Sequence, residues 1–98
     1  MRYVFSTLAQ KQYECKVNWY LLCQGKDFER SFTKNLFSTI DAIAQMPTIG
    51  RIERQGKQCT YCSFLAHPGC RIFYVHTATL IRIQHLDFSS MQTSLSQN

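Results

Sequence analysis

Acidic side chains are scarce in this sequence. Its 98 residues hold six Asp and Glu against eleven Lys and Arg, which gives a formal net charge of +5 and an isoelectric point near 9.1. A basic surface favours acidic partners, such as nucleic acid or an acidic protein. The imbalance is greatest after position 46, where five basic residues accompany only two acidic ones. The second half of the chain is therefore where we look for a binding surface.

Long apolar runs are absent as well. No stretch approaches the roughly eighteen residues that a membrane-spanning helix needs, and the first residues lack the basic and apolar segments of a secretory signal. The five cysteines are an odd number, which fits free thiols in a reducing compartment better than a disulfide framework. We expect a cytoplasmic protein that does not associate with membranes.

Glycine and proline are few, with four and two residues, so each one is a candidate boundary between elements. Arg2–Phe5 is predicted to be a short first strand. Thr7 and Gln10 then have the spacing of a capping box, which predicts a helix from about 8 to 24. Gly25 is placed to end that helix.

The next helix has the clearest periodicity in the chain, and Asp27 is its candidate cap. Its apolar residues recur three or four positions apart, as expected of a buried helix face. They are Phe28, Phe32, Leu36, Ile40 and Ile43. Pro47 ends this helix because the residue before a proline is disfavoured in helical geometry.

Strand signals dominate the remainder of the sequence. The stretch 47–58, with two glycines and three basic residues, is predicted to be a loop or an irregular edge. Residues 59–66 form the next strand candidate, and Pro68-Gly69 is a turn signal. Two runs rich in β-branched and aromatic residues, 71–75 and 80–86, predict a β-hairpin.

These elements follow the order β-α-α-β-β-β. Two consecutive helices between a first strand and later hairpins predict an α+β domain, with a helical hairpin on one face of a small antiparallel sheet. A helical hairpin and a sheet around one hydrophobic core need most of the 98 residues, which leaves no room for a second domain. We therefore expect a single domain over residues 1–88 and a flexible polar tail over 89–98.

The hairpin strands carry arginines among apolar neighbours. Because side chains alternate along a strand, Arg71 shares a face with Phe73, opposite Tyr74. On the second strand Arg82 lies opposite His85 unless a bulge intervenes. These arginines are expected on the uncovered face of the sheet, which is either simply solvated or a ligand-binding surface.

Three short motifs stand in a fixed order: P-T-I-G-R at 47–51, C-R-I-F-Y at 70–74 and R-I-Q-H at 82–85. With the order of elements, they resemble the RelE/ParE family of bacterial toxins over residues 3–85. The resemblance implies the toxin of a type II toxin–antitoxin system, a class tied to growth inhibition and plasmid stabilization. It also implies a cognate antitoxin as partner and no cofactor.

The family divides by target. ParE-like members inhibit DNA gyrase, whereas RelE-like members cut messenger RNA on the ribosome. The P-T-I-G-R and R-I-Q-H motifs look more like the ParE side. Gyrase binding is therefore the first prediction and ribosome-dependent endoribonuclease activity the alternative, so the question whether the chain is an enzyme stays open.

RNA cleavage needs a base, cations around the phosphorane and an acid. Glu53 is the candidate base and His85 the candidate acid, while Arg71 matches the family's strand arginine that steadies the phosphate. RelE-like members typically carry a Tyr or a His-Tyr pair near the C-terminal end. Here Asp87 and Phe88 stand in that place, and phenylalanine cannot donate a proton. This difference favours the binding function over the nuclease.

Four more basic residues are candidates for contacts with the RNA backbone or with an acidic segment of the antitoxin. They are Arg51, Arg54, Lys57 and Arg82. The alternative is a solvated basic edge that has no partner.

A cluster of soft ligands suggests a third, remote possibility. Cys59, Cys62, His67 and Cys70 have the spacing C-x2-C-x4-H-x2-C, which superficially resembles a zinc-binding nucleic-acid module. However, the final spacing is shorter than usual, and strand alternation puts Cys59 and Cys62 on opposite faces. We expect buried thiols and no metal.

Overall fold

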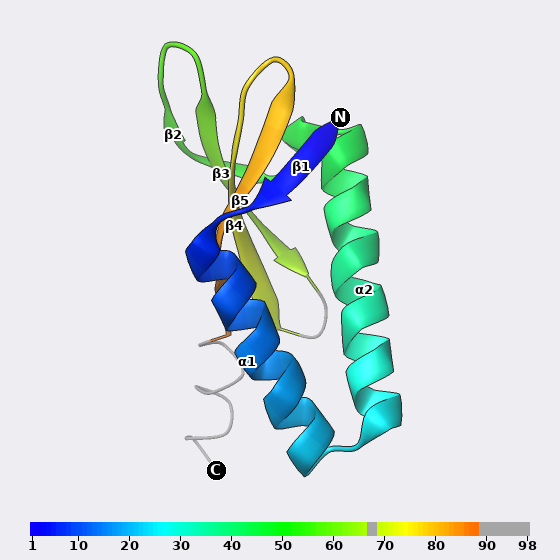
Figure 1. Cartoon of the computed structure of the whole chain (residues 1–98). Helices are drawn as coiled ribbons and strands as arrows, with labels where there is room; N and C mark the ends of the chain where they lie inside the picture. The colour runs from blue at the N-terminus through cyan, green and yellow to red at the C-terminus, as the bar shows by residue number, and fades with distance from the viewer. Residues whose placement is uncertain (67–68, 89–98) are drawn as a thin grey trace.

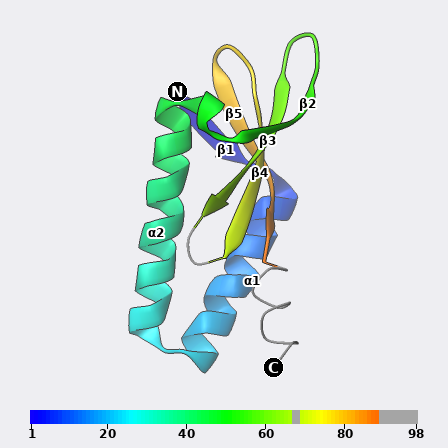
Figure 2. The same cartoon turned by 180° about the vertical axis from the view of Figure 1, so that it is seen from behind.

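The computed structural model describes residues 1–66 and 69–88. Within them, a helical hairpin packs against a five-stranded sheet of order β1-β5-β4-β3-β2 (Figures 1 and 2). The elements are β1 (Arg2–Phe5), α1 (Thr7–Cys23), α2 (Lys26–Gln45), the short 3-10 helix η1 (Pro47–Ile49), β2 (Arg51–Gln55), β3 (Thr60–Ala66), β4 (Cys70–His76) and β5 (Leu80–Asp87). The helix–helix turn lies at one end of the molecule and the tips of the β2–β3 and β4–β5 hairpins at the other.

The predicted α+β class and helical hairpin are confirmed, but the sheet differs in two details. It has one strand more than predicted, because the stretch 47–58 contains η1 and the edge strand β2. It is also mixed, since β1 pairs with β5 in parallel while the other pairs are antiparallel. The predicted tail, 89–98, lies outside the described residues.

Ser6, rather than Thr7, caps the first helix. Its Oγ accepts a hydrogen bond from the backbone N–H of Ala9 at 3.0 Å and donates one to the carbonyl oxygen of Gln84 at 2.5 Å. The same hydroxyl thus satisfies a helix terminus and ties it to β5. This second role depends on tertiary structure, so the local capping-box pattern could not predict it.

Gly25 separates the helices as predicted. Its φ of 94° is in the left-handed region, and its N–H donates to the carbonyl of Tyr20 at 2.9 Å, which closes α1. Gly25 is also the N-cap position of α2, so Asp27 lies within the first turn and is not the cap. There its carboxylate complements the positive end of the helix dipole.

The periodic face of α2 forms one wall of the core. Four of its five predicted core residues are buried, while Phe28 is 37 % exposed near the helix–helix turn. The helix ends at Gln45, two residues before Pro47, as expected. Neither helix, within the residues described, is long and apolar enough to cross a membrane.

The sheet is covered on one face only. Eight of its side chains toward the helices are at most 2 % exposed: Cys62, Ala66, Cys70, Ile72, Tyr74, Ile81, Ile83 and Leu86. On the other face of β4, Arg71, Phe73 and Val75 are partly exposed. The predicted assignment of faces along 71–75 is thereby confirmed.

Tyr74 connects the core to the tract 47–50. Its buried hydroxyl donates to the carbonyl of Pro47 at 2.6 Å and accepts from the N–H of Gly50 at 3.2 Å. Burial raises the pKa of Tyr74 to about 12. A side chain at Gly50 would overlap the hydroxyl and would lie 2.9 Å from the carbonyl oxygen of Ser63. The tyrosine therefore sets how η1 approaches the sheet and where β2 begins.

Replacing Tyr74 by phenylalanine should lower the free energy of unfolding by about 1–3 kcal/mol, because the Gly50 N–H and the Pro47 carbonyl lose their partner. Urea denaturation measures the change, and hydrogen exchange should show faster opening of β2. The control is Tyr61→Phe on the opposite face of the sheet, which should be nearly neutral. Equal losses for the two variants would contradict this role of Tyr74.

Candidate functional site on the open face of the sheet

Three rows of side chains cross the uncovered sheet face, because residues paired across neighbouring strands point to the same side. The central row is Arg51, Ser63, Phe73 and His85, on β2, β3, β4 and β5. One flanking row is Arg54, Tyr61, Val75 and Arg82, and the other is Leu65, Arg71 and Asp87. We call this surface the open face.

Two β-bulges bring additional functional side chains to this face. Glu53 is the extra residue in β2, and Gln84 is the extra residue in β5. On a regular strand, residues three positions apart lie on opposite faces, whereas a bulge puts them on the same face. His85 therefore lies on the same face as Arg82. The sequence predicted that Arg82 and His85 lie on opposite faces unless a bulge intervenes. The bulge is present, so the two side chains share a face.

The bulge at Gln84 is held by α1. Ser6, the N-cap of α1, donates two hydrogen bonds to β5: its N–H to the carbonyl of Ile83 at 2.9 Å, and its Oγ to the carbonyl of Gln84 at 2.5 Å. The N–H of Leu86 donates to Oε1 of Gln12 at 2.7 Å. Since α1 supplies these partners, the position of His85 depends on the contact between α1 and β5.

Arg51, Glu53, Ser63 and Arg71 form one hydrogen-bonded chain. Oε2 of Glu53 accepts from Nη2 and Nε of Arg51 at 2.8 and 3.0 Å and from Oγ of Ser63 at 2.6 Å. Nη1 of Arg71 donates to the same serine oxygen at 3.2 Å. The hydrogen bond from Ser63, followed by that from Arg51, holds the pKa of Glu53 below its usual value. The carboxylate is thus charged at neutral pH and engaged with its own chain.

An aromatic strip lies beside this charged chain. The rings of Phe73 and His85 stack with centroids 4.3 Å apart and planes 18° from parallel, and Tyr61 lies 6.2 Å from Phe73. Arg54 and Arg82 flank the strip in the neighbouring row. Flat rings with guanidinium groups around them suit a partner that carries both apolar and acidic groups.

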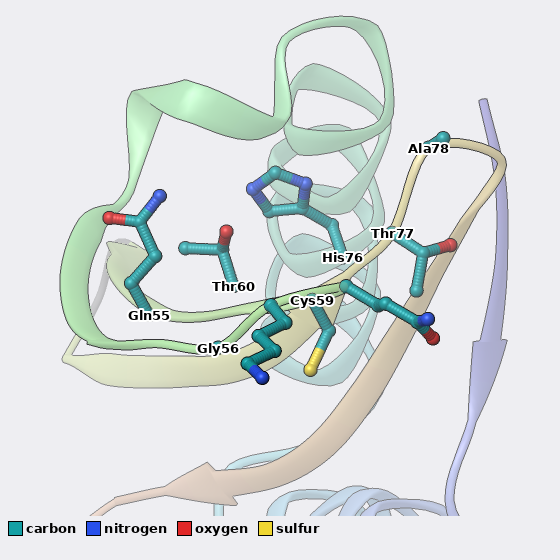
Figure 3. Close-up of a pocket in the computed structure, with 9 residues that line it drawn as sticks. Gln55, Gly56, Cys59, Thr60, His76, Thr77 and Ala78 are labelled. Atoms are coloured by element: carbon teal, nitrogen blue, oxygen red, sulfur yellow. The ribbon is translucent and has the colours of Figure 1, made fainter.

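Lys57 is placed differently from the other predicted residues. It lines a hollow of 280 Å³ between the tips of the β2–β3 and β4–β5 hairpins. Gln55, Thr60 and His76 project to one side of these tips (Figure 3), and the pairing of His76 with buried Ile81 identifies it as the helix side. The structure thus brings six of the seven predicted residues to the open face and leaves Lys57 at the hairpin tips.

Sequence reasoning missed Ser63 and Phe73, which join the predicted residues into one row. Ser63 is 1 % exposed, and its hydroxyl links Arg71 to Glu53. A lone serine within an apolar strand was the available signal, because a buried hydroxyl needs a partner. For Phe73 the signal was strand alternation, which put it on the face of Arg71, although a strand phenylalanine is ordinarily a core residue.

The cysteines do not converge on a metal site. Cys62 and Cys70 face the helices, where burial raises the pKa of Cys70 to about 12 and also raises that of Cys62. Cys70 pairs with Ala66, which is four residues, or about 13 Å, along β3 from Cys62. Cys59 is exposed, and His67 lies outside the described residues. No three potential ligands meet in the part of the chain that is described, so the geometry gives the zinc module no support.

Comparison with known proteins places the fold. No family model matches the chain, and neither does any curated protein. A solved structure, the chromosomal ParDE toxin–antitoxin (TA) system from P. aeruginosa, is similar over 89 % of this chain and 94 % of that one, with a TM-score of 0.71 and 10 % identity. This chain has the ParE/RelE-like toxin fold. At such low identity the similarity concerns the fold, and the chemistry must be argued from the open face.

The open face of this ParE/RelE-like fold offers four guanidinium groups, one imidazole, His85, and the carboxylate of Glu53. Glu53 is a weakened base because its donors stabilise the carboxylate. Phe88 packs toward the helices, 6.0 Å from the ring of Phe32 and beneath Nζ of Lys16.

The titration of Glu53 tests the charged chain. Its folded pKa is depressed, so its bonds contribute stability above the unfolded pKa, and that contribution is lost as the pH falls through the folded pKa. Ser63→Ala should move the Glu53 midpoint upward, toward 4.5, because the first cause of the depression is removed. NMR of the side-chain carboxyl carbon measures the midpoint. The exposed-helix control Ser38→Ala should leave it unchanged, and an unaltered midpoint in Ser63→Ala would disprove the assignment.

Proposed function

We propose that this chain is the toxin of a type II toxin–antitoxin pair and that it arrests growth by binding DNA gyrase. The observation that carries the proposal is a ParE/RelE-like fold whose open face presents arginines beside a carboxylate, Glu53, whose basicity is lowered by its own donors. The proposed activity requires no cofactor, and its target places the chain in the cytoplasm.

A cognate antitoxin is the proposed physiological partner. Arg51 and Arg54 lie on the exposed edge strand β2, which pairs with β3 on only one side. An acidic segment of the antitoxin would find guanidinium groups there that form bidentate bonds to carboxylates. It would also meet the aromatic strip of Tyr61 and Phe73. Occupation of this face by the antitoxin would keep the toxin from its target.

Ribosome-dependent cleavage of messenger RNA is the second candidate. A specific observation favours it: Glu53, Arg71 and His85, the proposed base, phosphate ligand and acid, all reach the open face. However, Glu53 is on β2 and His85 on β5, and the three strand spacings between them put the base and the acid about 14 Å apart at the backbone. The two groups would have to approach each other to act on one phosphodiester.

Arg71→Ala is the first test of the proposed function. Removing a charged donor from the site should weaken binding to purified gyrase about tenfold or more and relieve growth arrest on induction. Arg30→Ala, an exposed arginine on α2, removes the same charge and should remain toxic. The readouts are gyrase supercoiling and colony counts with and without the antitoxin. Full toxicity of Arg71→Ala would show that this arginine has no role.

His85→Ala separates binding from cleavage. If the chain acts on gyrase, transcripts from induced cells should remain intact and the variant should change toxicity only modestly. If it is a nuclease, codon-associated cuts should appear, and loss of the acid should slow them by a factor on the order of 10²–10⁴. Mapping transcript ends measures this. Cuts that disappear in His85→Ala would replace the gyrase proposal with the nuclease.

A further inference from the structure

One carboxylate oxygen, Oε2 of Glu53, lies where donors from two other residues converge. Nη2 and Nε of Arg51 approach it to 2.8 and 3.0 Å, and Oγ of Ser63 approaches it to 2.6 Å. Arg51 and Ser63 are direct partners across β2 and β3. The two residues thus surround an anionic oxygen, and in this structure that oxygen belongs to the chain itself.

The donors are held more firmly than the carboxylate that they bind. Ser63 is 1 % exposed on the inner strand β3, and its Oγ accepts from Nη1 of Arg71 at 3.2 Å, which directs its own proton toward Glu53. Glu53, in contrast, is the bulge residue of the exposed edge strand β2. An ion pair on such an exposed strand contributes little to stability. Glu53 can therefore turn into solvent while Ser63 and Arg71 keep their places.

We propose that Arg51, Ser63 and Arg71 form a binding site for an acidic side chain of a partner protein, and that this side chain displaces Glu53. The inference rests on the proposed role of the open face as the antitoxin-binding surface, and it does not depend on gyrase as the target. The partner's carboxylate takes over the hydrogen bonds of Glu53, so the buried hydroxyl of Ser63 is paired both before and after binding.

The charges around the site favour a carboxylate over the phosphates of a nucleic acid. Asp87 is the cross-strand neighbour of Arg71, so two carboxylates accompany the two guanidinium groups of the site. A backbone with one charge per nucleotide meets repulsion here as well as attraction. One carboxylate that replaces another leaves the charge within the site unchanged.

The neighbouring side chains describe the partner further. Phe73 follows Ser63 in the central row, and the ring of Tyr61 lies 6.2 Å from that of Phe73. Apolar contacts to these rings are available to a segment whose acidic residue sits in the place of Glu53. The partner segment therefore carries an apolar residue close to its acidic one.

Glu53 and the partner compete for one set of donors. The apparent dissociation constant of the partner is the intrinsic one divided by the fraction of molecules in which the site is free. Charge-assisted hydrogen bonds strong enough to lower the pKa of Glu53 keep the site closed most of the time. If it is closed in about 90 % of the molecules, Glu53 weakens binding about tenfold.

Fluorescence anisotropy of a labelled oligoglutamate peptide, titrated with the full chain made in a cell-free system, tests the site. Glu53→Ala should bind the peptide about tenfold more tightly than the unaltered chain. The control Asp41→Ala removes the same charge from an exposed position on α2 and should change the affinity less than about twofold. Equal gains in the two variants, or no gain in Glu53→Ala, would overturn the proposal.

Coupling to Ser63 separates displacement from mere repulsion between carboxylates. Repulsion by Glu53 acts with or without the serine, so Glu53→Ala would then give the same gain in a Ser63→Ala chain. Displacement requires the donor, and the gain in that background should fall below about threefold. An undiminished gain would refute displacement. Urea denaturation of each variant verifies that the compared chains are folded.

A uridine oligonucleotide with the same charge as the peptide distinguishes the two kinds of partner. The gain from Glu53→Ala should be smaller for the oligonucleotide than for the peptide. A gain that is as large or larger for RNA would assign the site to phosphate and overturn the acidic side chain as its ligand. Because these titrations contain neither gyrase nor ribosome, a failure of the gyrase proposal would leave their results unchanged.

Discussion

Covering the sheet on one face alone is the constraint from which the site follows. The helices bury the side chains of Ile72, Tyr74 and Ile83, so the arginines of the central strands must be on the other face. Desolvating an unpaired guanidinium beneath the helices would be far more costly than leaving it exposed. Arg71 and Arg82 are consequently on the open face whatever their function, and their location alone is no proof of one. The hydrogen bonds among Glu53, Ser63 and Arg71 and the stacking of Phe73 on His85 are the stronger evidence for a functional site.

Those contacts depend on two interruptions of regular pairing. Without the bulges at Glu53 and Gln84, Arg54 and His85 would lie on the helix side of the sheet. A bulge leaves backbone groups without ladder partners, and in β5 these are satisfied by Ser6 and Gln12 from the start of α1. The first helix thus does more than cover the core, since its first two turns fix the orientation of one edge of the open face.

Sequence alone was sufficient where the signals are local. The three-and-four spacing on α2, Gly25 between the helices and Pro47 after α2 each act within a few residues, and each prediction agrees with the structure. Interactions between distant residues were not predictable in this way. Strand β2 has little apolar pattern, and its start is fixed by the hydroxyl of Tyr74, 24 residues away from Gly50. The bulges, the cap at Ser6 and the link through Ser63 likewise rest on partners from other elements.

The electrostatics of Glu53 bears on the choice between binding and cleavage. A general base acts best when its pKa lies near the working pH, and catalytic carboxylates reach that range by burial or by proximity to like charge. Here a serine and an arginine do the opposite, because they stabilise the charged form. The same bonds hold Arg51 and Ser63 in fixed positions, and Arg71 through Ser63. An arrangement that lowers basicity while fixing the donors in place is suited to recognising a partner's acidic groups, and it makes Glu53 a weaker base for RNA cleavage than an unbonded carboxylate would be.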